Sequence, residues 1–159
     1  MSSPDVSVRT TIRRPVADVW RAVADPSRIV SWSPEASGVR VEATGVLPVG
    51  AVFSGSNRNG LFRWSTTCRV IESTPGEAFA FDVSFQGMAV SRWRYALSRS
   101  DDGTDAACTV EEQWWDRRGL PMKVMGIVGT GVADRAAHNE RTMRATLDAL
   151  RAELEAAPD

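Results

Sequence analysis

Segments that alternate hydrophobic and polar residues, separated by turn signals, occupy the middle of this chain and constrain its fold most. Six of them follow one another at hairpin spacing: "GVRVEAT" (38–44), "GAVFSGSN" (50–57), "LFRWSTTCRVIES" (61–73), "EAFAFDVSF" (77–85), "VSRWRYALSRS" (90–100) and "DAACTVEEQWW" (105–115). The connections "LPVG", "NRNG", "TPG", "QGM" and "SDDG" are short and rich in turn-forming residues. Short connections join antiparallel neighbours, so this run predicts one antiparallel meander.

The segments before and after this meander include helical patterns as well as one further strand pattern. "VSVRTTI" (6–12) alternates like a strand, and residues 15–32 show helical spacing broken at Asp25-Pro26, which predicts two short helices. After the meander, apolar residues recur three to four apart from Ile127 to Leu154. That spacing predicts one long amphipathic helix from about 122 to 156.

The order of these elements predicts an α+β fold. A curved antiparallel sheet of about seven strands wraps round the long C-terminal helix, and two short helices follow the first strand. The length of 159 residues fits a single domain over 1–159, with a core from about 5 to 156. The space between a curved sheet and one helix is a natural ligand cavity.

Charge and composition narrow the function. A net charge of −1 without any Lys/Arg block argues against nucleic-acid binding. "VMGIVGTGV" (124–132) is too short to span a membrane, and the N-terminus lacks an apolar signal core, so we expect a cytoplasmic protein without a membrane span. One histidine and two separated cysteines predict neither a metal site nor another cofactor. We expect a monomer or a weak homodimer.

The strand parity predicts which side chains face the cavity. In 108–116, the apolar Cys108 and Val110 carry Glu112 and Trp114 inward, and Glu111 and Trp115 then face outward. A β-bulge in this strand would invert the assignment from its position onward.

An inward carboxylate among aromatic side chains is costly unless it is hydrogen-bonded, so Glu112 is the main candidate for a functional group. Tyr95, Thr66, Ser91 and Asn139 are its candidate partners, and loss of hydration should raise its pKa. Glu112 is a candidate general acid/base, a ligand anchor or a structural acid in the cavity wall.

The remaining candidate ligand contacts follow from the same parity and from the helix stripe. Aromatic side chains also simply fill cores, so each of these positions has a structural alternative. The predicted ligand-binding set is Trp32, Phe53, Trp64, Thr66, Phe81, Ser91, Trp93, Tyr95, Glu112, Trp114, Val132, Asn139 and Met143.

Three further features have a functional and a structural interpretation. His138 lies off the apolar stripe, which places it at solvent or an edge and makes a Ser-His or Cys-His catalytic arrangement very poor. "NRNG" (57–60) is a gate or an ordinary hairpin turn. "WDRRG" (115–119) is an anion-binding segment or a pair of solvated arginines.

Several segments together resemble a known family: "WSPE" (32–35), "GAVFSGSNRNGLFRWSTTCRV" (50–70), "PGEAFAFDV" (75–83), "SRWRYAL" (91–97), "GTDAACTVEEQWWDRRG" (103–119) and "NERTMRATLDALRAELE" (139–155). They resemble the polyketide cyclase/dehydrase-like branch of the START-like (SRPBCC, helix-grip) superfamily. The resemblance covers nearly the whole chain and implies the same fold. That superfamily contains aromatase/cyclases, lipid and hormone carriers and chaperone activators, and the resemblance assigns no catalytic residue.

The expected function is the binding of a small hydrophobic, aromatic or polyketide-like, molecule in the internal cavity. The first alternative is a polyketide cyclase, aromatase or dehydratase that uses Glu112 as its acid/base. The second alternative is a regulatory domain that binds a protein through its outer sheet face.

Overall fold

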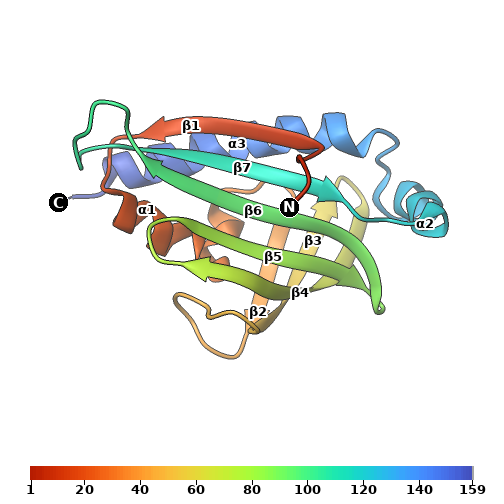
Figure 1. Ribbon diagram of the computed structural model, residues 1–159. Coiled ribbons are helices and arrows are strands. Elements are labelled where there is room, and N and C mark those ends of the chain that lie inside the picture. The colour runs from red at the N-terminus through yellow and green to blue at the C-terminus, as the bar shows by residue number, and fades with distance from the viewer. Residues whose placement is uncertain (159) are drawn as a thin grey trace.

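The computed structural model describes residues 1–158 and shows a curled antiparallel sheet packed against a long C-terminal helix (Figure 1). Its elements are β1 Val6–Ile12, α1 Val16–Val23, the 3₁₀ helix η1 Pro26–Ser31, β2 Ala36–Val41, β3 Val52–Asn59, β4 Phe62–Thr74, β5 Ala78–Phe85, β6 Met88–Arg99, β7 Cys108–Asp116, α2 Leu120–Thr130 and α3 Arg135–Ala156. The strand order β1-β7-β6-β5-β4-β3-β2 makes β2 to β7 a meander that β1 extends. The predicted α+β helix-grip fold is confirmed, including the two short helices after β1.

The register of β7 determines where its acids point. β7 pairs with β1 and β6 without a register shift, so Glu112 lies opposite Val8 and Tyr95. Glu112 is 3% exposed, whereas the side chain of Glu111 is 25% exposed and pairs with Arg9. The shifts in the sheet lie elsewhere, in β2, β4 and β5–β6. The predicted parity of β7 is therefore confirmed.

Trp115 differs from the simple outward expectation. It belongs to the convex face of the sheet, yet only 8% of it is exposed. Its indole N–H donates a hydrogen bond to the Ser2 carbonyl at 2.9 Å, because the N-terminal residues lie across this part of the sheet. Alternation gives the face of a side chain correctly but says nothing about what covers that face.

The single helix predicted over 122–156 is wrong. Two helices occupy this region, and α2 ends at Gly131, whose φ of 70° is the left-handed conformation that closes many helices. α3 begins after Asp134, whose carboxylate accepts a hydrogen bond from the Ala137 N–H at 3.0 Å. A glycine stop and an aspartate cap interrupt an apolar spacing that otherwise continues through both helices.

The end of the sheet nearest α1 is tightly packed. Val19, Ala22 and Phe79 have no exposed surface, and the Trp20 indole donates to the Ala78 carbonyl at 3.0 Å. The C-terminal half of α3 adds the buried Leu147, Leu150 and Leu154. This end supplies the core that positions the rest of the sheet.

Candidate functional site

A cavity of about 300 Å³ lies between the concave face of the sheet and the two C-terminal helices. Side chains from η1, six strands and both helices line it, and most of them are apolar. Ten of the predicted ligand-binding residues lie in its wall: Phe53, Trp64, Thr66, Phe81, Ser91, Trp93, Glu112, Trp114, Asn139 and Met143. Their contact with a ligand remains a prediction, but the predicted faces converge on one cavity.

Three predicted contacts lie outside this wall. Trp32 and Tyr95 border a separate void of about 10 Å³ nearer α1. The Trp32 indole donates to Glu153 at 2.8 Å, and this bond turns the ring toward α3. Val132 is buried in the turn between α2 and α3, because the helix that was expected to present it ends at Gly131.

Part of the wall comes from α2, which the single helix predicted over 122–156 does not anticipate. Met122, Met125, Gly126 and Gly129 border the cavity, and a Cβ at Gly129 would meet nothing within 4 Å. The break after α2 turns this short helix over the open end of the sheet.

Glu112 is the ionisable group at the closed side of the cavity. The Tyr95 hydroxyl donates to its Oε1 at 3.0 Å, whereas its buried Oε2 has no hydrogen-bond partner within residues 1–158. Burial raises the pKa of Glu112 to about 8, and the Tyr95 hydrogen bond only partly offsets this shift. The carboxyl group is therefore largely protonated at neutral pH.

Tyr95 supports Glu112 from behind. Burial raises the pKa of the Tyr95 phenol well above its ordinary value, and the neighbouring carboxylate raises it further. The phenol therefore remains a hydrogen-bond donor at neutral pH. It fixes one oxygen of Glu112 and leaves the other for the cavity.

Asn139 brings a second buried polar group to the cavity from α3. It is 1% exposed, and its Oδ1 has no hydrogen-bond partner among the residues that the structure describes. Buried polar atoms without partners are rare in folded proteins, because each costs about 1–3 kcal/mol. Glu112 and Asn139 thus mark the polar part of a largely apolar cavity.

Aromatic side chains form two groups along the wall. The rings of Trp93 and Trp114 lie 6.4 Å apart at 55°, and the Trp93 indole N–H donates to the Ser91 hydroxyl at 3.2 Å. Phe53 and Phe81 meet edge to face at 5.3 Å. These contacts orient the rings and leave flat apolar surfaces available to a ligand.

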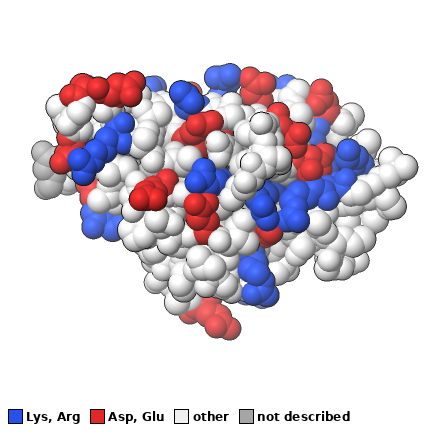
Figure 2. All heavy atoms as spheres, in the orientation of Figure 1, with Lys and Arg blue, Asp and Glu red and all other residues white. Residues whose placement is uncertain are grey.

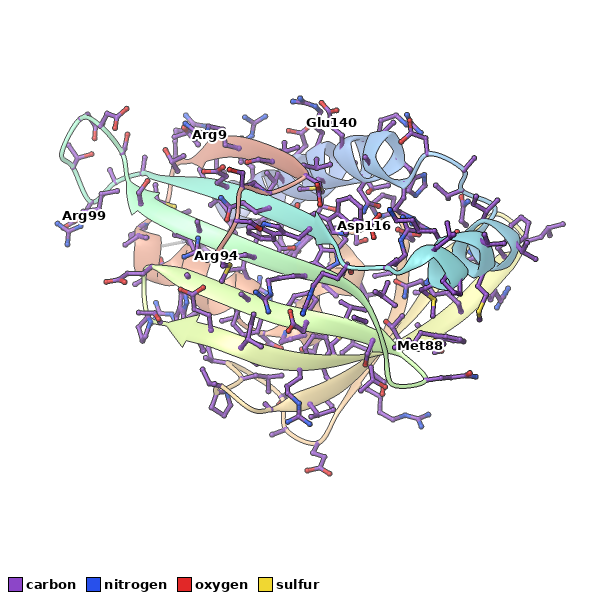
Figure 3. The ribbon with its side chains drawn as sticks, turned by 45° about the vertical axis from the view of Figure 1, so that its right-hand side comes forward. Arg9, Met88, Arg94, Arg99, Asp116 and Glu140 are labelled. Atoms are coloured by element: carbon purple, nitrogen blue, oxygen red, sulfur yellow. The ribbon has the colours of Figure 1, made fainter. Side chains whose placement is uncertain are left out.

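Three charged residues of the wall, Glu35, Arg118 and Arg135, each form an ion pair. Arg135 donates to Glu35 at 2.8 Å and lies over the Trp64 ring at 5.6 Å. Arg118 forms two hydrogen bonds with Asp116 at 2.9 and 2.8 Å, so it is not the solvated arginine expected of "WDRRG". Figure 3 shows Asp116 where β7 leads toward α2. These pairs add little net charge to the cavity.

The sequence places His138 at solvent or an edge, and the structure shows it partly buried beside Glu35, outside the cavity wall. The His138 side chain is only 17% exposed, and its Nε2 lies 3.7 Å from Glu35. Burial lowers the pKa of His138, although Glu35 opposes that shift. His138 is absent from the cavity wall and instead belongs to the Glu35–Arg135 cluster.

The described residues give no support for thiol catalysis, a metal site or a membrane-spanning helix. Burial raises the pKa of the Cys68 thiol to about 12, so this cavity residue is not a thiolate nucleophile. Within residues 1–158, no group of three or more His, Cys, Asp or Glu side chains is arranged to hold a metal ion. In the same residues, no helix combines the length and hydrophobicity needed to cross a membrane.

Comparisons with known proteins agree with this architecture. A family model described as "Polyketide cyclase / dehydrase and lipid transport" matches residues 3–155. No curated protein sequence matches the chain significantly.

Several solved structures are similar in fold. CV1439 from Chromobacterium violaceum has a TM-score of 0.66 at 18% identity, and the match covers 97% of each chain. DynU16, from the dynemicin biosynthetic locus, gives 0.62 at 19% identity over 95% of this chain and 47% of DynU16. The di-domain ARO/CYC StfQ of the steffimycin pathway gives 0.66 at 12% identity over 94% of this chain and 44% of StfQ. The chain thus spans about half the length of these two proteins, and the likeness is one of fold.

Proposed function

Because the chain belongs to the polyketide cyclase/dehydrase and lipid transport family, we propose that its cavity binds a small aromatic or polyketide-like molecule that carries a hydroxyl group. Family membership is consistent with a hydrophobic ligand, and the apolar wall is consistent with the same class. The volume of about 300 Å³ lies at the small end of ligand pockets and favours a compact ligand.

The observation that carries this proposal is the pair of unpartnered buried oxygens, Glu112 Oε2 and Asn139 Oδ1. A protonated Glu112 has an O–H to donate, and the Asn139 carbonyl oxygen accepts. A ligand hydroxyl accepts from the first and donates to the second. An apolar body with such a group satisfies both the walls and the polar part of the cavity.

A second candidate is catalysis of cyclisation, aromatisation or dehydration, and one observation favours it. The pKa of Glu112 is raised to about 8, and a proton shuttle is most effective when its pKa lies near the working pH. Glu112 would then move a proton to or from the substrate hydroxyl or carbonyl. The other ionisable groups of the wall are the paired Glu35, Arg118 and Arg135 and the neutral Cys68, so no second acid/base completes the arrangement. Binding is therefore preferred.

Native mass spectrometry of the protein purified from its own host tests the binding proposal. We expect one retained molecule per chain, apolar and with at least one hydroxyl group. Trp93→Ala should reduce its retention, because Trp93 forms part of the wall. A retained molecule without any hydroxyl, or retention unchanged in Trp93→Ala, would contradict the proposal.

Catalysis is tested with that retained molecule or its precursor as substrate. A loss of turnover of about a hundredfold or more in Glu112→Gln, with affinity kept, is the size expected for a lost acid/base group. That result would make the protein an enzyme. If Glu112→Gln lowers the affinity for the ligand and does not slow any turnover, Glu112 is a ligand anchor.

A further inference from the structure

The end of the molecule that carries α2 exposes a cluster of large hydrophobic side chains. Figure 2 shows the tip of this end, at the position of α2 in Figure 1, as a largely uncharged area bordered by Lys and Arg. Leu61 is 98% exposed, Leu120 76% and Val128 74%. We call the cluster the α2 patch; it consists of Leu61, Phe62, Met88, Leu120, Val124, Met125, Ile127 and Val128.

The sequence of α2 explains why it exposes so much apolar surface. Leu120, Val124, Ile127 and Val128 are four, three and one residues apart, so they share one helical face, and that face points away from the protein. The other side of α2 covers the cavity through Met122 and its neighbours. A short helix that is apolar on its outer face as well as its inner one indicates an interaction surface.

The β3–β4 hairpin tip is joined to α2 and extends the patch. The Phe62 ring packs so closely on Gly131 that a Cβ there would lie 2.5 Å from it. The Asn59 side chain also donates to the Thr130 carbonyl at 2.9 Å. Met88, at the β5–β6 turn, lies at the same end of the molecule (Figure 3). Three separate segments thus build one apolar surface.

The charges around the patch are positive. The segments 57–63, 86–90 and 117–130 contain no aspartate or glutamate. Arg58, Arg63 and Lys123, the chain's one lysine, are exposed in them.

Asp82, outside these segments, binds Arg117 of the last one, and three further acids also have partners in the fold. Asp116 binds Arg118, Asp134 caps the start of α3, and Glu35 binds Arg135. An apolar surface with a cationic border complements a layer of anionic headgroups above hydrocarbon.

We propose that the α2 patch docks this protein on a membrane surface that contains anionic phospholipids. The 11 residues of α2 are too few to span a bilayer, so the helix lies in the interface plane. A second copy of the chain fits less well, because a two-fold contact would bring these like charges together. Met125 and Gly129 of the same helix border the cavity, so a hydrophobic molecule can pass between bilayer and cavity at this end.

Vesicle co-sedimentation tests the proposal without knowledge of the ligand. The wild-type chain should bind vesicles of mixed phosphatidylglycerol and phosphatidylcholine and bind pure phosphatidylcholine vesicles much less. Leu61→Asp combined with Val128→Asp should weaken the binding about tenfold or more, because a charge then enters the apolar interface. Salt of about 0.5 M should also weaken it, since screening reduces the attraction of the cations.

The matched control is Val46→Asp combined with Val49→Asp, which introduces the same two charges at side chains that are 41% and 61% exposed in the β2–β3 connection, outside the patch. It should bind vesicles like the wild type. Absence of vesicle binding by the wild type, or equal losses in control and patch variants, would overturn the proposal. A concentration-dependent dimer that the patch variant abolishes, without vesicle binding, would also overturn it and assign the patch to a second copy.

The same variants separate this proposal from the proposed function. 2-Naphthol, an aromatic compound with one hydroxyl group, serves as the test ligand for the cavity. The patch variant should bind it as tightly as the wild type does, because both substituted side chains point away from the cavity. Vesicle binding without 2-naphthol binding supports the docking surface while the ligand proposal fails. The reverse result leaves the ligand proposal standing and overturns the docking surface.

Discussion

The two ends of the curled sheet are built for different tasks. At the α1 end, Phe79 and Leu150 are completely buried, and only a void of about 10 Å³ remains. At the α2 end, sheet and helices enclose about 300 Å³, and the covering helix exposes Val128 to solvent. One end resembles an ordinary protein core, and the other is left unfilled.

This difference shows that a small domain can obtain its stability from one end and keep a cavity at the other. The closed end buries the leucines of α3 and stabilises the fold, so the open end need not be filled. Substitutions at the closed end should therefore change stability, and substitutions at the open end should mainly change binding.

The largest expected effect comes from the closed end. Phe79→Ala should lower the free energy of unfolding by about 3–5 kcal/mol, because it leaves a cavity in a packed core. Denaturant unfolding followed by circular dichroism measures the loss. A cost below about 1 kcal/mol would show that the α1 end is as loosely packed as the other.

The next effect is a pH dependence that belongs to Glu112. Burial raises its pKa from an ordinary value of 4.5 to about 8, so the folded state keeps a proton that the unfolded state releases between these pH values. Stability from this group is complete below pH 4.5 and decreases as the pH rises to about 8. The loss amounts to a few kcal/mol, since one pKa unit corresponds to about 1.4 kcal/mol.

Glu112→Gln isolates this contribution. Its unfolding free energy should lose the decline between pH 4.5 and 8 that the wild type shows. Urea titrations at several pH values measure both proteins. Parallel pH profiles would mean that Glu112 is ionised in the folded protein and that the cavity is wetter than its burial indicates.

A smaller effect is expected from the aromatic wall. Trp64 is only partly buried, so Trp64→Ala should change stability less than Phe79→Ala does. The affinity of this variant for 2-naphthol should fall about two- to tenfold, because a lost aromatic contact is worth about 0.5–1.5 kcal/mol. Calorimetric titration measures the affinity. Unchanged affinity with a large loss of stability would reverse the distinction between the two ends.

The smallest effect is predicted for Glu111→Gln, the neighbour of Glu112 on the opposite face. Glu111 accepts from Ser7 and pairs with Arg9, whose side chain is 71% exposed. Surface pairs of this kind contribute about 0–1 kcal/mol, so stability and 2-naphthol affinity should remain nearly unchanged. Equal effects of Glu111→Gln and Glu112→Gln would mean that the two faces of β7 have been assigned incorrectly.

The sequence predicts the sheet and the inward acid because strand alternation and turn residues are local signals. Glu112 and Trp114 follow from the parity of Cys108 and Val110 in one uninterrupted strand. The end of α2 at Gly131 cannot be recognised from the apolar spacing, because that spacing continues on both sides of it. Periodicity detects a face of a helix but not the point at which the chain changes direction.

The position of Trp32 depends on a long-range hydrogen bond that no local pattern contains. Trp32 is drawn to Glu153, which is 121 residues away in the sequence. Tyr95 is different, because its hydrogen bond to Glu112 was predicted and is confirmed, but that bond places Tyr95 behind the wall that it was expected to form. The apolar spacing of 122–156 predicts one helix and does not show that the outer face of α2 is exposed.

The proposed function requires the cavity to recognise an apolar molecule through a hydroxyl group at Glu112 and Asn139. Calorimetric titration of the wild type and Asn139→Leu with 2-naphthol and 2-methoxynaphthalene measures this recognition. The methyl ether is more apolar but has no hydroxyl to donate to Asn139. The wild type should bind one 2-naphthol per chain about tenfold more tightly than the ether, the size of one buried hydrogen bond, and Asn139→Leu should lose that preference. Equal affinities, a preference for the ether, or a preference that survives in Asn139→Leu would contradict the account.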